Sequence, residues 1–470
     1  MENSHLTAVM RTFSKKEARD LRKWLNSPVH NQREDVILLF EYLMAGAHLE
    51  DDKFLHKERV FSKLFPDEAY DDAKLRQSMH FLLKSVEEFL IYQELHDDEV
   101  RSRMALASVY RKRKLDKAFQ KTIKSVETLQ EDAPYRNEQF LRNEYLLQLE
   151  KYNFQEGKKR TIEMNLQTVS DALDMTFLAD KLRQSCLMLA HQAVYKAQYN
   201  IGLLDEVLHF AERGAYLQHP AIAIYYYGYK AVTDESGEEY FQHLRQEIQK
   251  NKDHFPHSEL RDIYLMAINY SIRQVNKMGK EHYLRELFEL YRNGIENKIL
   301  IENNELSRFT FRNTINTGIS LKEFDWINNF IDEYQIYLPA QHRENLVQFS
   351  RARLHFAKKE YKKAMRLLAQ SDFDDILTNL YGKSMLIMMY YEEEEMDALE
   401  SLIESMRTYM RRKEVMGSYK HIYSNLIKYT KKLIRINPFD KEEKDKLAQE
   451  IKGTSPLPEK EWFLKQLEKI

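Results

Sequence analysis

Residues 361–368 read YKKAMRLL and place Tyr361, Ala364 and Leu368 three and seven positions apart. This spacing puts the three side chains on one face of an α-helix. Similar sets of mainly apolar residues begin 35 to 43 residues apart along the chain. They are Leu166/Val169/Leu173, Leu204/Val207/Ala211, Phe241/Leu244/Ile248, Leu284/Leu287/Tyr291, Phe324/Ile327/Ile331, Tyr361/Ala364/Leu368 and Met396/Leu399/Ile403. A period of this length is typical of stacked helix pairs, so the pattern predicts an α-solenoid.

Residues that interrupt helices are scarce, which agrees with this prediction. The 470 residues include only 12 Gly and 9 Pro, and this scarcity argues against a strand-rich fold with many tight turns. Gly157, Gly202, Gly237, Gly279 and Gly318 mark the expected linkers, several of them just before the second helix of a pair, where a helix stop is needed.

The two ends of the chain differ from the repeated middle. Ser14 and Glu17 have the spacing of a capping box, and helices are expected from there to about residue 26 and at about 33–46, 56–64 and 71–96. After Pro438, a capping helix is expected at 439–452, followed by a short helix whose Trp462, Phe463 and Leu467 cover the end of the stack. We therefore predict an N-terminal helical domain at 1–98, helical repeats at 99–436 and a C-terminal cap at 437–470.

The stretch from Ala352 to Ala364 resembles a tetratricopeptide repeat. That family has a small residue in its first helix, an aromatic residue at the start of its second and alanine three residues later, and Ala352, Tyr361 and Ala364 match these positions. The other units keep the spacing and vary the residues, so they would also suit other α-solenoids. With this resemblance, the predicted fold class is all-α: a right-handed α-solenoid of stacked antiparallel helix pairs.

The resemblance implies that the first helices line a concave groove that binds a protein or peptide. Its groove positions lie six and three residues before the small residue and one after it. Applied along the chain, these offsets give the following candidates for partner binding: Gln192, Lys196, Tyr226, Tyr229, Asn269, Asn276, Arg312, Asn316, Phe349 and Arg353. They also give Ile272, Phe309, Tyr381, Ser384 and Met388. Ordinary helix surface is the alternative interpretation of these positions.

Motifs for catalysis or metal binding are not found. Gly382-Lys383-Ser384 lacks the first glycine of a phosphate-binding loop and lies in an expected helix. His254 and His257 lack further ligands at a zinc spacing, and the single cysteine, Cys186, lies in an apolar run that predicts a buried thiol. We expect no catalytic residues, no cofactor and no metal, and therefore a protein that is not an enzyme.

Two segments, 101–124 and 407–435, are strongly basic, although the chain as a whole has a net charge of −2. Either could be a solvated helix face or could bind an acidic partner or a nucleic-acid backbone. Tyr110 and Phe119 are the only aromatic residues of the segment 101–124, so the sequence does not indicate a stacking platform for bases.

The leading functional prediction is a non-enzymatic scaffold or adaptor that binds a protein or peptide in the concave groove. Association with nucleic acid through the basic segments is the second hypothesis. A regulator, in which a ligand on the repeats controls the N-terminal domain, is the third. The sequence lacks an apolar stretch of membrane-spanning length and an evident signal sequence. We therefore expect no membrane partner and a cytoplasmic location.

Overall fold

The computed structural model describes residues 1–156, 164–195, 197–235, 237–278, 281–369, 376–412 and 418–470. Within these ranges the chain consists of 23 α-helices, four short 3-10 helices and one two-stranded hairpin, so the all-α prediction is confirmed. None of the described helices combines the length and the apolar character needed to cross a membrane.

The chain forms two compact units. The first comprises Met1–Lys181 and Asp205–Ile222, and the second comprises Leu182–Leu204 and Ala223–Ile470. The boundary therefore passes through the long helix α9 (Leu166–Val194), whereas the sequence analysis placed its divisions near residues 98 and 436.

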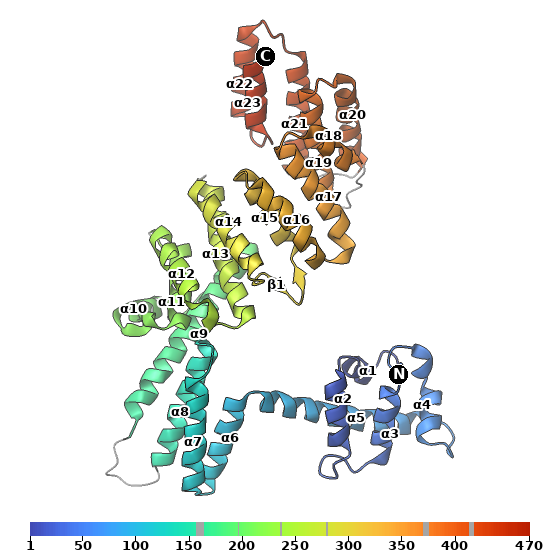
Figure 1. Cartoon of the computed structure of the whole chain (residues 1–470), viewed down its shortest axis with the longest axis vertical. Coiled ribbons are helices and arrows are strands. Elements are labelled where there is room, and N and C mark those ends of the chain that lie inside the picture. Colours follow the sequence, from blue (N-terminus) through green and yellow to red (C-terminus); the bar gives the residue numbers. More distant parts are fainter. Residues whose placement is uncertain (157–163, 196, 236, 279–280, 370–375, 413–417) are drawn as a thin grey trace. The chain divides into compact units, whose positions relative to one another are not determined.

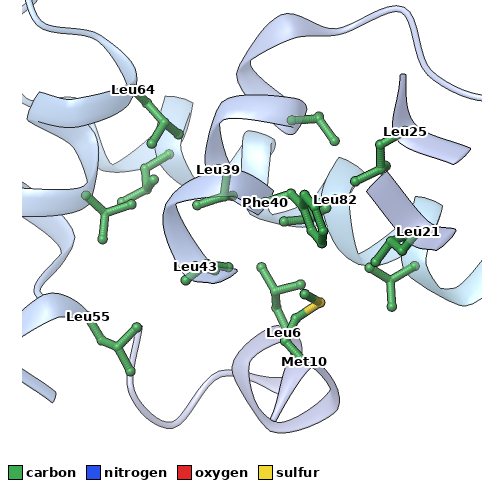
Figure 2. Packing of buried hydrophobic residues seen from close by; sticks show 14 of the residues in the cluster. Leu6, Met10, Leu21, Leu25, Leu39, Phe40, Leu43, Leu55, Leu64 and Leu82 are labelled. Atoms are coloured by element: carbon green, nitrogen blue, oxygen red, sulfur yellow. The ribbon is translucent and has the colours of Figure 1, made fainter. Parts of the chain in front are cut away.

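The first unit begins with a small helical core, in which the helices expected from the sequence are present. Its elements are α1 (His5–Met10), α2 (Lys15–Leu25), α3 (Glu34–Met44), η1 (Asp52–Phe54), α4 (Lys57–Leu64) and α5 (Asp72–Asp97). Ser14 and Glu17 form the predicted capping box at the start of α2. Figure 2 shows the side chains that meet between these helices, including Leu21, Phe40 and Leu82, all of which are buried.

A three-helix bundle follows within the same unit. Helices α6 (Glu99–Lys112), α7 (Asp116–Glu131) and α8 (Glu138–Glu156) pack against one another, and they can be followed side by side in Figure 1. Phe119 of α7 stacks on Phe154 of α8 with ring centroids 3.9 Å apart. The described part of the unit also includes most of α10 (Leu204–Arg213), η2 (Ala215–Gln218) and the first residues of α11 (Pro220–Thr233).

In the second unit, packed pairs of helices follow one another along the chain. The elements of this part of the chain are α12 (Gly237–Asn251), η3 (Lys252–His254), α13 (His257–Met278), α14 (Glu281–Glu296), β1 (Ile301–Glu302), β2 (Glu305–Leu306), α15 (Arg308–Ser320), α16 (Phe324–Tyr334), η4 (Gln335–Tyr337), α17 (Ala340–Ala357), α18 (Tyr361–Ala369), α19 (Ile376–Glu392), α20 (Met396–Arg412) and α21 (Ser418–Arg435). Helices α13 and α14, α15 and α16, α17 and α18, and α19 and α20 pack as pairs, and successive pairs also contact each other (Figure 1).

Six of the seven recurring sets lie on even-numbered helices from α10 to α20, and their second and third residues are all buried. These sets therefore mark apolar faces that pack, as predicted. The first set is different. It lies in the first half of the 29-residue helix α9, where Leu166 and Leu173 are 54% and 47% exposed.

Four helix pairs are joined by the same tight turn. Lys114, Lys322, Lys359 and Glu394 adopt positive φ angles of 59° to 62°, each two residues before the next helix begins. In each turn the following backbone N–H donates to a carbonyl five residues earlier, for example Glu360 N to His355 O at 2.9 Å. This hydrogen bond is the Schellman motif, which usually places glycine at the left-handed position.

Gly202 lies in the turn before α10, as the sequence predicted. Two other glycines have roles that differ from the prediction. Gly318 lies inside α15, where a Cβ atom would be 2.5 Å from Ile327 Cδ1 and 2.9 Å from Phe288 Cε2. Gly237 is the buried first residue of α12, and a Cβ there would be 2.5 Å from the Ala231 carbonyl oxygen. Both allow close packing instead of ending a helix. Gly157 and Gly279 lie outside the described residues.

The C-terminal helices cover the last pairs, as expected. Helices α22 (Lys441–Gly453) and α23 (Lys460–Lys469) pack against each other, and α23 also contacts α21. Phe463 and Leu467 are buried in the core that α19, α20 and α21 share with these helices, and Trp462 is partly buried against it.

We predict that Gly318→Ala destabilises the chain by about 1–3 kcal/mol, because the added methyl group overpacks the contact between α15 and α16. The shift in the urea midpoint of unfolding measures this effect. Gly453→Ala, at the end of α22, is the matched control, since nothing lies within 4 Å of its Cβ position. Equal midpoints for the two variants would show that the close approach at Gly318 is not needed.

Candidate functional site

A hollow of about 470 Å³ lies between the first helices α13 and α15 of two neighbouring pairs. Its wall also includes Tyr291 of α14 and the segment that carries the hairpin of β1 and β2. The lining residues are Arg261, Leu265, Ile268, Asn269, Ile272, Tyr291, Leu300, Glu302, Asn303, Glu305, Ser307, Phe309, Thr310 and Asn313. Three residues at predicted groove positions, Asn269, Ile272 and Phe309, therefore lie around the same hollow.

The hairpin forms one side of the hollow and was not predicted from the sequence. Ile301 pairs with Leu306 and Glu302 with Glu305, which leaves Asn303 and Asn304 as a two-residue turn. Both turn residues have positive φ, 50° and 62°, and asparagine tolerates this conformation better than most residues. The available sequence signal was the asparagine pair itself, which is flanked by Glu302 and Glu305, with Ile301 and Leu306 outside them.

An ion pair fastens the hairpin to α13. The Arg261 guanidinium lies 2.9 Å from a carboxylate oxygen of Glu302. Glu302 and Glu305 are directly opposite each other in the hairpin, where like charges repel, and Arg261 offsets one of the two. The His257 ring adds a second link between α13 and the segment before the hairpin through a contact of 2.9 Å from Nε2 to the Lys298 carbonyl oxygen.

Phe309 is the largest apolar side chain exposed at the rim of the hollow, with 54% of its surface accessible. Two guanidinium groups lie against its ring, that of Arg308 at 4.9 Å and that of Arg312 at 5.7 Å from the centroid. Across the hollow, Asn269 is exposed and makes no side-chain hydrogen bond with the described residues. An exposed apolar ring and an exposed carboxamide thus line the hollow, and two exposed guanidinium groups lie beside the ring.

Asn316 and Arg353 connect α15 to α17. The Arg353 guanidinium donates a short hydrogen bond to Asn316 Oδ1, and it lies 5.0 Å from the ring centroid of Tyr381 on α19. These two predicted groove residues are therefore in contact with each other, and Arg353 is held on both sides.

The part of the predicted groove next to Arg353 is closed. Phe349 is only 5% exposed, and Ser384 and Met388 are also buried. Trp462 of α23 packs against the apolar cluster that contains Phe349 and Met388. Burial raises the pKa of the Glu459 carboxyl just before α23, and the positive charge of Arg353 opposes this shift.

Glu392, the last residue of α19, holds α23 in this position. Its Oε1 accepts hydrogen bonds from Trp462 Nε1 at 2.7 Å and Gln466 Nε2 at 3.0 Å, and its Oε2 accepts one from the Tyr361 hydroxyl at 2.8 Å. Burial, together with the nearby Glu392 carboxylate, raises the pKa of Tyr361. The sequence analysis assigned no specific contact to this position, because the partners on α23 lie 70 and 74 residues further along the chain.

The remaining candidates are dispersed. Tyr226 is 2% exposed, and its ring contacts those of Tyr227 and Tyr240 at 5.3 and 6.2 Å, so it belongs to the core. Tyr229 and Gln192 are partly exposed on α11 and α9, and Asn276 is exposed near the end of α13. Lys196 lies outside the described residues.

Two further lining residues, Ser307 and Tyr291, make local interactions. Ser307 caps α15, since its Oγ accepts a hydrogen bond from Phe309 N at 3.3 Å. Burial raises the pKa of the Tyr291 phenol, and its hydrogen bond with Asn313 opposes this shift. No histidine, cysteine or lysine is among the described residues that line the hollow.

The other residues considered for chemistry are accounted for by packing. Cys186 is buried, its thiol donates to the Tyr225 carbonyl oxygen at 3.2 Å, and burial raises its pKa to about 12. Ser384 donates to the Leu380 carbonyl oxygen inside α19, which confirms that Gly382-Lys383-Ser384 is helical. Among the described residues, no cluster of side chains is arranged to hold a metal ion.

Comparison of the chain with protein-family models, with curated proteins and with solved structures finds no match.

We predict that Glu392→Ala lowers the free energy of unfolding by about 2–3 kcal/mol, since it leaves three hydrogen-bond donors without their charged acceptor. Chemical unfolding followed by tryptophan fluorescence measures the loss. Glu393→Ala removes an adjacent exposed carboxylate and should leave the midpoint unchanged. If both variants unfold alike, Glu392 does not secure α23.

Proposed function

We propose that this chain is a non-enzymatic scaffold that binds a protein or peptide in the hollow between α13 and α15. We also propose that its helix pairs stack as a right-handed solenoid of the tetratricopeptide type and that it acts in the cytoplasm. The observation that carries the proposal is the exposed Phe309 ring at the rim of a hollow whose wall includes Asn269 and Ile272.

The size and lining of the hollow suit one anchoring side chain of a partner. A volume of about 470 Å³ is within the usual range of binding pockets. Leu265, Ile268 and Ile272 supply apolar contact along α13. An aliphatic or aromatic side chain could fill this space, while Asn269 and Asn303 offer amide groups to the partner's backbone.

Phe309 and Arg312 have the character of residues that contribute most to protein interfaces. Aromatic residues and arginine are enriched at such interfaces and among the residues that dominate binding energy. The contacts with Arg308 and Arg312 also restrain the Phe309 ring before a partner arrives, and a side chain that is already positioned loses less entropy on binding.

The closed section beside Arg353 limits where a partner can bind. There Phe349 and Met388 are buried and α23 packs against their cluster. The α13–α15 section, in contrast, leaves Phe309, Asn269 and Arg312 accessible. This difference supports the α13–α15 section as the docking site.

Affinity purification from the source cells, with partners quantified by mass spectrometry, tests this proposal. We expect Phe309→Ala and Arg312→Glu each to reduce recovery of the bound partner at least about tenfold, equivalent to about 1.4 kcal/mol of binding energy. Both side chains are exposed, so these changes should leave the fold intact.

Arg366→Glu provides the matched control. Arg366 is an exposed arginine on α18, a second helix, and has no ion-pair partner among the described residues. It undergoes the same change of charge as Arg312→Glu and should retain the partner. Equal recovery with the wild-type chain and all three variants would refute docking at the hollow.

A further inference from the structure

A continuous group of cations occupies the outer side of α7 and the turn before it. Lys117, Lys121 and Lys124 are exposed and lie within a 60° sector of α7 at 100° per residue, opposite the buried Phe119 and Val126. Lys112, Arg113 and Lys114 at the turn between α6 and α7 are also exposed. We call these six residues the α7 basic face.

Three carboxylates of the same bundle are paired with other cations. Glu150 binds Arg111 at 2.7 Å on a nearly buried side of the bundle. Glu127 binds Lys151 at 2.5 Å, and Glu99 binds Arg103 at 2.7 Å. The bundle therefore balances charge on its other sides, while none of the six cations of the basic face has an ion-pair partner among the described residues.

This arrangement is unfavourable for the isolated helix. Lys117 and Lys121 are four residues apart and Lys121 and Lys124 three apart, and like charges at these spacings repel by roughly 0.2–0.5 kcal/mol per pair. Lys117 also lies in the first turn of α7, where the helix dipole favours negative charge. A polyanion bound along this face would relieve both effects.

The second basic segment differs, because acids are placed against its cations. Lys431 and Arg407 both pair with Glu404, at 2.7 and 3.4 Å, and Lys432 pairs with Glu450 at 2.5 Å. The other described cations of this segment, Arg411, Arg412, Lys420, Lys428 and Arg435, are divided between α20 and α21. In the first segment, three lysines that are unpaired among the described residues lie together on one side of α7.

We propose that the α7 basic face binds the phosphate backbone of double-stranded nucleic acid without reading its sequence. Lys117 and Lys124 are about 10 Å apart along the helix axis at 1.5 Å per residue. A DNA duplex presents one negative charge per about 1.7 Å of its own axis, so several phosphates lie within reach of the face.

The aromatic residues of the segment favour a duplex over a single strand. Phe119 is buried and stacked on Phe154, and Tyr110 packs against the same core. Neither ring is therefore placed as an open platform on which unpaired bases could stack, which is the main contribution in single-strand recognition. The cations can contact phosphates, which a duplex displays on its outside.

The composition of the face also favours nucleic acid over a protein or a lipid surface. Lysine is depleted at protein interfaces, whereas Lys117, Lys121 and Lys124 supply all the charged side chains of the outward 60° sector of α7, which they share with the exposed Thr128. A helix that lies on a bilayer buries apolar residues in it, but Phe119, Ile123 and Val126 of α7 are all buried inside the bundle.

Fluorescence anisotropy with the full chain and a labelled 20-base-pair DNA duplex tests the proposal. Binding is expected at 50 mM salt and should weaken about 10³-fold at 200 mM, as six phosphate contacts require. The combined variant Lys117→Glu, Lys121→Glu, Lys124→Glu should weaken binding more than tenfold, and the corresponding glutamine variant should have an intermediate effect. The glutamine variant also shows that the loss follows charge, because it introduces no new carboxylate.

Lys441→Glu, Lys444→Glu, Lys446→Glu is the matched control, since it makes the same charge change on α22, where acids alternate with lysines. It should change the affinity less than twofold, and circular dichroism of all variants should match the wild type. The proposal is overturned by absence of duplex binding at 50 mM salt or by equal losses in the α7 and α22 variants. Equal or tighter binding to a dT20 strand, or to vesicles with 30% phosphatidylserine, also overturns it.

Discussion

The close approach of the two helices within a pair is the constraint on which the second unit depends. Ala352 of α17 and Ala364 of α18 are fully buried where these helices pack. Because Gly318 has no Cβ atom, the side chains of Ile327 and Phe288 can pack directly against α15. At these positions even one additional methyl group would meet packed atoms. Small residues at the contacts therefore set how near α15 and α17 lie to the helices packed against them.

The sequence predicted the helices well because their signals are local. The capping box of Ser14 and Glu17 and the recurring sets on α10 to α20 depend only on residues within one or two helical turns. The turns were less accessible to prediction. Lys322, Lys359 and Glu394 adopt the left-handed conformation that usually indicates glycine, so the residue type gives no sign of the turn.

The candidate site was predictable only in part, for a similar reason. The family resemblance pointed to Asn269, Ile272 and Phe309, which do line one hollow. The closure beside Arg353 depends on contacts between Glu392 and two residues of α23 that lie 70 and 74 positions further along the chain. Such long-range contacts leave no periodic pattern, and the same holds for the ion pair of Arg261 and Glu302 that fixes the hairpin.

The two proposed surfaces differ in physical character. The hollow between α13 and α15 combines a restrained aromatic ring with carboxamides and arginine, which suits a partner that inserts a side chain. The α7 basic face is a group of five exposed lysines and one exposed arginine, which suits the repeated charges of a phosphate backbone. A chain with both surfaces could hold a protein partner and a nucleic acid at once.

Hydrogen exchange of the purified chain, measured with and without its co-purified partner, tests docking at the hollow most directly. The proposed site predicts slower exchange of backbone amides in α13, in the hairpin at 301–306 and in the first half of α15. The second helices α14, α16 and α18 should exchange at the same rate in both states. Slower exchange confined to those second helices, or to α22 and α23, would contradict docking at the hollow.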